Sequence, residues 1–426
     1  MITLEDCQQR DAADALRPLR ALFHLPQGLI YLDGNSLGPM PLAAVARAQD
    51  VVAREWGEGL IRSWNSADWF TMPQRLGARI APLIGAAPDQ VLVTDTTSVN
   101  LYKVLFAALA MARQDQPERR VVLSERSNFP TDLYIAHSLC AAQGFTLKLL
   151  EPHEIASALG ADSAVLLLTH VNYRTGAMHD MAGVSAAARQ AGALMVWDLA
   201  HSAGAVPVDL LAAGADFAVG CSYKYLNGGP GAPAFLWVHP QHSARFAQPL
   251  SGWWGHAAPF AFTPDYQPAP GVARYLCGTQ PILSLALLDC GLDVFDQAQA
   301  LGGMAALRAK SLALSELFIA LVEQQCSDFG LGLATPRASA ERGSQVSLTR
   351  AHGAGGHAIM QALIARGVIG DFRAGDGAAQ LDILRFGLAP LYLRFEDLWH
   401  AVDHLRQVLA RGEWQQAQFQ RAHAVT

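Results

Sequence analysis

Short apolar runs alternate with helical patterns through the middle of the chain. Between residues 74 and 290 the apolar runs predict strands at 91–94, 120–124, 146–150, 164–168, 193–197, 217–219 and 234–238, with helices between them at 98–112, 131–143 and 180–192. Several runs contain no polar residue, which is typical of strands covered on both faces. The alternation predicts an α/β fold with a large, mostly parallel, doubly wound sheet.

The two ends of the chain have different patterns. Residues 3–24 are predicted to be helical with a break near Pro18, 29–33 to form a short strand, and 41–57 to form an Ala-rich helix. A long helical stretch is predicted from 282 to 326, followed by strands near 346–349, 368–372 and 383–386 and helices near 356–366 and 395–411. We therefore expect an N-terminal segment (1–60) that packs with the small domain, a large α/β domain (61–290) and a small C-terminal α+β domain (291–426).

Composition limits the class of protein. The chain has 426 residues, of which 51% are hydrophobic and 16% charged, which indicates a compact globular protein. A net charge of -6 provides no basic surface for nucleic acid, and no apolar run approaches the length of a membrane span. The amino terminus is polar and is not a signal peptide. The six cysteines have no metal-binding spacing, so we expect no metal centre and a cytoplasmic protein.

A lysine stands just after one of the predicted strands. Lys224 lies between Tyr223 and Tyr225, followed by a glycine-rich turn. Most lysines in such a position are simply solvated. A lysine shielded from water loses its proton more easily and can form a Schiff base with an aldehyde. Residues at other strand ends favour this second interpretation, because together they supply the contacts that pyridoxal 5′-phosphate needs.

Two strand-to-helix junctions offer groups for the phosphate and ring of this cofactor. N–H groups and hydroxyls at a helix start suit a phosphate, and an aromatic side chain can stack on a pyridine ring. The phosphate candidates are Thr97 and Ser98, and the ring candidates are Phe129, Pro130, Thr131 and Asp132. Ordinary helix capping is the competing explanation for both junctions.

An acid at the end of another predicted strand is a candidate partner for the ring nitrogen of the cofactor. Asp198 follows an apolar run, where a carboxylate would hold a proton on the pyridine nitrogen and make the ring an electron sink. His201, three residues on, could hydrogen-bond or stack nearby, whereas helix capping is the alternative role for Asp198. Lys224 could then act as the general base, and Tyr223 could contact the phosphate or donate a proton.

Several loop residues are further candidates. An indole N–H from Trp253 and a hydroxyl from Thr279 could close the phosphate site, within one subunit or across a dimer interface, or could hold their own loops. Trp64 suits a flat aromatic substrate and equally a packed core. The turn with Asn35 and Ser36 could present N–H groups to a ligand or be an ordinary turn.

Six segments carry a resemblance to a known family: 31–41, 129–132, 198–201, 222–231, 252–256 and 385–392. Asp-x-x-His and Ser-x-Lys also occur in class V aminotransferases and cysteine desulfurases, but Gly-Trp-Trp-Gly-His and Tyr-Leu-Asn-Gly-Gly-Pro-Gly are narrower. Together the segments, which extend along nearly the whole chain, resemble kynureninase, a fold-type-I pyridoxal-phosphate hydrolase. The family often has asparagine where Thr279 stands, and some members have a histidine near Trp64 that this chain lacks. These two differences leave open which residues contact the aryl ring of the substrate.

The resemblance implies a residue set and a reaction. Catalysis would fall to Lys224, Tyr223 and Asp198, and the substrate would contact Arg385, Trp64, Asn35 and Ser36, with Arg385 on the α-carboxylate. Cofactor contacts would come from Thr97, Ser98, Phe129, Pro130, Thr131, Asp132, Thr169, Asp198, His201, Tyr223, Lys224, Trp253 and Thr279. The implied reaction converts L-kynurenine, or its 3-hydroxy form, to an anthranilate and L-alanine in tryptophan degradation or NAD biosynthesis. A homodimer with the active site at the subunit interface is also implied.

Three other functions are open on the residues alone. A cysteine desulfurase needs a nucleophilic cysteine on a mobile loop, and Cys326 instead ends a helical pattern. An aminotransferase is the closer enzymatic alternative, distinguished by a keto-acid product. A non-catalytic scaffold on the same fold would be expected to have lost Lys224 or Asp198, and both are present.

Overall fold

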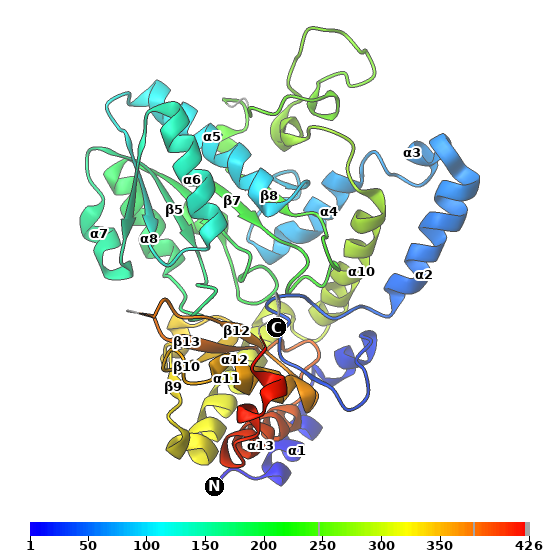
Figure 1. Ribbon diagram of the computed structural model, residues 1–426. Helices are drawn as coiled ribbons and strands as arrows, with labels where there is room; N and C mark the ends of the chain where they lie inside the picture. Colours follow the sequence, from blue (N-terminus) through cyan, green and yellow to red (C-terminus); the bar gives the residue numbers. More distant parts are fainter. Residues whose placement is uncertain (246–247, 378–379, 422–426) are drawn as a thin grey trace.

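A seven-stranded sheet is the largest element of the computed structural model, which describes residues 1–245, 248–377 and 380–421 (Figure 1). Its strands are β2 (Val91–Val93), β3 (Val121–Glu125), β4 (Thr146–Leu150), β5 (Ser163–Thr169), β6 (Leu194–Asp198), β7 (Phe217–Gly220) and β8 (Phe235–Val238), in the order β2-β8-β7-β6-β5-β3-β4. Strand β8 is antiparallel to both neighbours, and the remaining pairs are parallel. The predicted mostly parallel α/β sheet is confirmed.

Apolar side chains on both faces of the sheet hold the covering helices. Along β5, Val165 and Leu167 belong to one core cluster, and Leu166 and Leu168 belong to the other. Successive strand residues point to opposite faces, which explains why this run has no polar alternation. The first cluster includes α5 (Thr97–Asp115) and α6 (Pro130–Gln143), and the second includes α4 (Met72–Ile80), α7 (Ile155–Ala158), α8 (Met181–Ala191), α9 (Leu210–Ala213) and α10 (Ile282–Gln299).

A smaller α+β unit follows, and the N-terminal segment packs on it. Its antiparallel sheet has the order β12 (Asp371–Arg373), β13 (Asp382–Gly387), β10 (Gln345–Arg350) and β9 (Gly332–Leu333), with helices α11 (Gly303–Cys326), α12 (Gly356–Ala365) and α13 (Phe395–Ala410). Helix α1 (Leu4–Ala13) packs against α13, and Figure 1 shows the two side by side. Strand β1 (Ile30–Tyr31) pairs in parallel with β11 (Val368–Ile369).

Three predicted elements are divided in the structure. The stretch 282–326 is two helices, α10 and α11, because Gly302 and Gly303 have left-handed φ angles of 102° and 59°. The predicted helix 41–57 is α2 (Ala43–Asp50) continued by a π-helix (Val51–Gly59), with the short α3 (Ser63–Ser66) beyond it. The predicted strand 368–372 is interrupted at Gly370 between β11 and β12.

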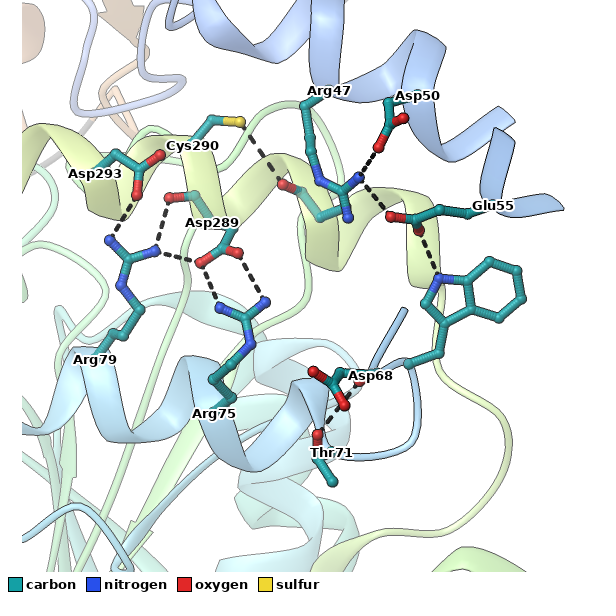
Figure 2. Close-up of polar contacts among 12 residues, drawn as sticks. Arg47, Asp50, Glu55, Asp68, Thr71, Arg75, Arg79, Asp289, Cys290 and Asp293 are labelled. Carbon is teal, nitrogen blue, oxygen red and sulfur yellow. Dashed lines mark hydrogen bonds and ion pairs between the residues drawn. The ribbon is translucent and has the colours of Figure 1, made fainter. Parts of the chain in front are cut away.

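Ion pairs join α4 to α10 and α2 to the π-helix, and a hydrogen bond from Trp69 links the π-helix to the following segment (Figure 2). Arg75 of α4 binds Asp289 of α10 through two hydrogen bonds of 3.0 and 2.7 Å. In the π-helix the buried Glu55 accepts hydrogen bonds of 2.7 Å from Arg47 and from the indole N–H of Trp69. A buried carboxylate requires such partners, so these contacts fix the segment that carries the predicted residue Trp64.

The described residues set two further limits. None of their helices is long and apolar enough to cross a membrane. Within the same residues, no group of three or more His, Cys, Asp or Glu side chains is arranged to hold a metal ion.

Candidate active site

A cavity of about 250 Å³ lies where the carboxyl ends of the central strands meet the starts of α5 and α6. Ligands of doubly wound sheets bind at this edge, because the parallel strands all deliver their following loops there. Ten of the predicted residues line the cavity: Thr97, Ser98, Phe129, Thr131, Asp132, Thr169, Asp198, His201, Tyr223 and Lys224. Thr96, Ala200, Gly231, Ala232 and Ala234 also line it.

The amine of Lys224 points into this cavity. Its Nζ atom lies 3.3 Å from Nε2 of His201 and 6.0 Å from the centroid of the Phe129 ring. Burial lowers the pKa of Lys224, although the charge of Asp198 opposes this effect. Burial also lowers the pKa of His201 well below its usual range, so the imidazole is neutral. A lysine with a lowered pKa presents its neutral amine more readily, and this is the form that attacks an aldehyde.

Asp132 and Asp198 form a buried pair of carboxyl groups. Each is 3% exposed, and their side chains hydrogen-bond to each other. Burial and the charge of Asp198 raise the pKa of Asp132 well above its usual range. Burial also raises the pKa of Asp198, but the Ala200 N–H, which donates to it at 2.8 Å, and the charge of Lys224 act in the opposite direction. The hydrogen bond between the two carboxyls requires one proton, and the directions of the two pKa shifts favour Asp132 as its donor and Asp198 as its acceptor.

The first turn of α5 forms the opposite wall. Thr97 and Ser98 are its first two residues, and the N-cap is Thr96, whose hydroxyl accepts a hydrogen bond from the Val99 N–H at 3.3 Å. N–H groups in the first turn have no partners inside the helix, and the helix dipole favours an anion there. The sequence alone did not single out Thr96, because three consecutive Ser or Thr residues are equally suited to capping.

Phe129 forms a side wall directly before α6. Its N–H donates to Oδ1 of the buried Asn128 at 2.7 Å, and the Thr169 hydroxyl donates to the same oxygen. The ring of Tyr173 meets the Phe129 ring edge-on, with centroids 5.3 Å apart. Pro130 is the first residue of α6 and is not among the residues that line the cavity. Asn128 was missed in the sequence, where it is one polar loop residue among several.

Arg385 of β13 lies outside the cavity wall but within electrostatic range of Lys224. Its guanidinium donates to the Tyr173 carbonyl at 2.8 Å and to the Ser36 hydroxyl at 2.7 Å, and it forms an ion pair with Asp371. The Arg385 and Asp371 side chains are each 2% exposed. The N-terminal segment, the small domain and the large domain therefore meet at one cation.

Two more residues of the N-terminal segment lie at this junction. Asn35 is fully buried, and its backbone hydrogen-bonds to the His201 ring. Burial and the charge of Asp371 raise the pKa of Asp33 to about 6. Neither Asp33 nor Asp371 was identified from the sequence, although an acid within an apolar strand pattern, as in 368–372, is a signal for a buried charge partner.

The remaining three candidates lie away from the cavity lining. Trp64 and Trp253 pack edge to face with centroids 6.3 Å apart, and Trp253 stacks on Trp254 at 5.3 Å. Thr279 is exposed, in the segment between the cavity and α10. Trp253 and Thr279 do not line the cavity within this subunit.

Solved structures with the same fold come from pyridoxal-phosphate enzymes. A cysteine desulfurase from Thermococcus onnurineus NA1 has 17% identity and a TM-score of 0.77, covering 92% of this chain and 98% of that one. A C-DES variant with glycine covalently linked to its PLP cofactor has 18% identity and a TM-score of 0.79, covering 91% and 98%. This chain therefore shares the fold of these enzymes and places an amine, an acid pair and a helix start around one cavity at the edge of its sheet.

The sequence comparisons specify the family. The kynureninases of Burkholderia mallei (strain SAVP1) and Pseudomonas fluorescens are each 58% identical to this chain over 429 residues, covering 100% of both sequences. A family model described as kynureninase C-terminal domain matches residues 307–405. The chain belongs to the kynureninase family.

Proposed function

We propose that the protein hydrolyses the Cβ–Cγ bond of L-kynurenine, consuming one water and releasing anthranilate and L-alanine. The observation that carries this conclusion is the 58% identity to kynureninases across the full length of both chains. The reaction belongs to tryptophan degradation and NAD biosynthesis, and 3-hydroxy-L-kynurenine is a second proposed substrate. We also propose a cytoplasmic location.

The cavity fits pyridoxal 5′-phosphate, the cofactor of this enzyme. When bound, the cofactor supplies an electron sink for the carbons next to the substrate amine. Lys224 would hold its aldehyde carbon, and the ionised Asp198 would keep the ring nitrogen protonated. Thr97 and Ser98 would bind the phosphate through first-turn N–H groups and hydroxyls, while Phe129 would stack on the ring. The neighbours Pro130, Thr131, Asp132, Thr169 and His201 would shape the ring site.

The substrate would approach from the Arg385 side of the cavity. A guanidinium binds a carboxylate through two parallel hydrogen bonds, so Arg385 is proposed to hold the α-carboxylate. Lys224 would take the proton from Cα, and Tyr223, which lines the cavity, would deliver a proton to the β-carbon. Trp64, Asn35 and Ser36 are proposed to position the rest of the substrate.

A homodimer with the active site at the subunit interface is also proposed. The placement of Trp253 and the exposed Thr279 outside the cavity supports it, since a second subunit could bring its own copies to the phosphate end. Mixing Lys224→Ala with Thr279→Ala subunits should then restore part of the activity, because some mixed dimers contain one intact site. Absence of any recovery, with dimers present by ultracentrifugation, would contradict a shared site.

A cysteine desulfurase activity is disfavoured by the placement of the cysteines. Cys326 ends α11 with 1% exposure, and burial raises its pKa to about 12. A nucleophilic cysteine needs an exposed, low-pKa thiol. The remaining cysteines are buried as well, except the half-buried Cys277.

The direct test is to incubate the purified protein with pyridoxal phosphate and L-kynurenine. Release of fluorescent anthranilate with equimolar alanine is expected, whereas a keto acid would indicate an aminotransferase. Lys224→Ala should lose the absorbance band of the lysine-linked cofactor together with activity. Persistence of that band would show that another amine holds the cofactor.

A further inference from the structure

The proposed chemistry does not use one fully buried cation, Lys103, which lies in α5 on the helix whose start forms the phosphate wall. Its side chain is 0% exposed. The Nζ atom lies 2.5 Å from the Asp95 carboxylate and donates to the Tyr275 carbonyl at 2.6 Å. An ammonium group this deep is costly unless it is paired and hydrogen-bonded.

Asp95, the partner of Lys103, is in a strained backbone conformation. Its φ angle is 48°, in the left-handed region, which is unfavourable for a residue with a side chain. Asp95 directly precedes Thr96, the N-cap of α5. The conformation of Asp95 therefore sets the direction in which the first-turn N–H groups of the helix point.

Lys103 and Asp95 also connect the other segments around the phosphate end. The Asp95 N–H donates to Gln280 Oε1 at 3.0 Å, and the Asp95 carbonyl accepts from the N–H of Ala234, a cavity residue, at 2.9 Å. The Lys103–Tyr275 bond holds the same 275–280 segment from its other end, and this segment carries Thr279. The Lys103 ammonium and the Asp95 backbone together connect the helix start, the 231–234 wall and the 275–280 segment.

We propose that Lys103 is a positioning residue for the cofactor phosphate. Through Asp95 it keeps the strained residue in place and aims the start of α5 at the phosphate, without touching the cofactor itself. This inference rests on the proposed function, since it assumes that a phosphate is bound at Thr97 and Ser98. The competing explanation is a purely structural ion pair in the core.

A positioning role predicts that replacing Lys103 weakens the binding of a ligand with a phosphate more than that of a ligand without one, whereas a purely structural ion pair predicts no such difference. Apo protein would be titrated with pyridoxal 5′-phosphate and with pyridoxal, which lacks the phosphate but keeps the aldehyde and ring. Lys103→Met keeps most of the aliphatic stem and removes the charge. We expect the affinity for pyridoxal phosphate to fall about 10-fold or more and the affinity for pyridoxal to change less than about 2-fold.

Lys310→Met is the matched control. Lys310 is another buried lysine, paired with Asp14 at 2.7 Å, with side-chain exposures of 6% and 8%, and it lies in the small domain away from the cavity. Its substitution should lower the melting temperature while leaving the ratio of the two affinities unchanged. The double variant Asp95→Asn, Lys103→Met removes both charges, so it avoids leaving the half-buried Asp95 carboxylate without Lys103 if Lys103→Met alone fails to fold.

The binding measurements distinguish the role of Lys103 from the proposed function of the protein. Loss of discrimination between the two ligands in the Lys103→Met or double variant supports the positioning role. An unchanged ratio, or equal losses for both ligands, would overturn it while the native protein still bound pyridoxal phosphate. If the native protein bound neither ligand, the proposed function would fail and the role of Lys103 with it.

Discussion

Two carboxyl groups share the inner end of the cavity, and their unequal environments decide which one keeps the proton. The charge of Lys224 and the Thr169 hydroxyl favour the ionised form of both carboxyls, but Asp198 also accepts a hydrogen bond from the Ala200 N–H at 2.8 Å. The asymmetry leaves Asp198 as the anion, which is the form that can hold a cationic ring nitrogen. The role proposed for Asp198 thus depends on a neighbour that the sequence motif does not explain.

Asp198→Asn tests this role. The amide keeps the shape but cannot balance a positive ring nitrogen, so turnover of kynurenine should fall about 10²- to 10³-fold while the cofactor still binds. Release of anthranilate gives the rate, and absorbance gives cofactor content. Asp180→Asn is the control, because Asp180 only caps α8 at the surface. A rate within ten-fold of the native value would remove Asp198 from the ring-nitrogen role.

Arg385 requires a substitution that separates binding from folding. Arg385→Ala would remove one of the arginines that pair with the buried Asp371, leaving Arg373 at 2.8 Å, so its kinetics would be mixed with a loss of stability. Arg385→Lys keeps the charge but loses the planar fork, and KM for kynurenine should rise about 30-fold with a smaller change in kcat. Thermal unfolding of both variants gives the stability difference. An unchanged KM in the lysine variant would make Arg385 a structural residue.

At the scale of elements, two glycines explain why the single long helix predicted from the sequence was wrong. The predicted range 146–150 is β4 to the residue, because alternation and a flanking glycine agree there. The stretch 282–326 was predicted as continuous because its apolar period passes through Gly302 and Gly303, and only their left-handed φ angles divide it. Nine of the ten cavity residues could be predicted from their places at strand ends and helix starts, and Thr169 came from the family resemblance. Thr96 could not be told from the neighbouring hydroxyl residues that suit capping equally. Asp33, Asn128 and Asp371 could not be predicted, since their roles come from contacts between distant segments.

Gly302→Ala tests the importance of this helix break. A φ of 102° is unfavourable for a residue with a Cβ atom, and the added carbon would lie 2.9 Å from the Ala306 side chain. We expect a loss of about 1–2 kcal/mol in unfolding free energy, measured by denaturant titration. Gly160→Ala is the control, because its φ is not left-handed and the nearest atom to an added Cβ is Oδ1 of Asp162 at 3.5 Å. Equal stability of the two variants would contradict a conformational requirement at Gly302.

At the scale of the whole molecule, buried charges join the N-terminal segment to both domains. Asp33 is 9% exposed and lies near Asp371, Arg385 and Arg373. The two arginines favour its ionised form, but burial and Asp371 outweigh them. The junction is therefore expected to be more stable when Asp33 carries a proton.

The contribution of Asp33 to the free energy of unfolding therefore changes with pH in one direction. The pKa of Asp33 is about 6 in the folded protein and near 4 when unfolded, so its stabilising contribution is complete below pH 4 and is lost as pH rises through 6. The contribution is on the order of 2 kcal/mol. Asp33→Asn should remove it, making the variant relatively more stable than the native protein above pH 6 in thermal unfolding. The exposed Asp89→Asn is the control. Parallel stability profiles for Asp33→Asn and native protein would refute the assignment.

The pairing of β1 with β11 also constrains how the protein is made. All residues that line the cavity precede residue 235, yet Asn35 reaches His201 from a segment whose neighbour, Leu32, accepts a hydrogen bond from Gly387 at 2.6 Å. The N-terminal segment can therefore reach its final position only after residues about 350 positions later have been translated. The ribosome must release nearly the entire polypeptide before this part of the molecule can assemble. A prematurely terminated product could therefore contain every residue that lines the cavity and still lack the contacts that hold the N-terminal segment in place.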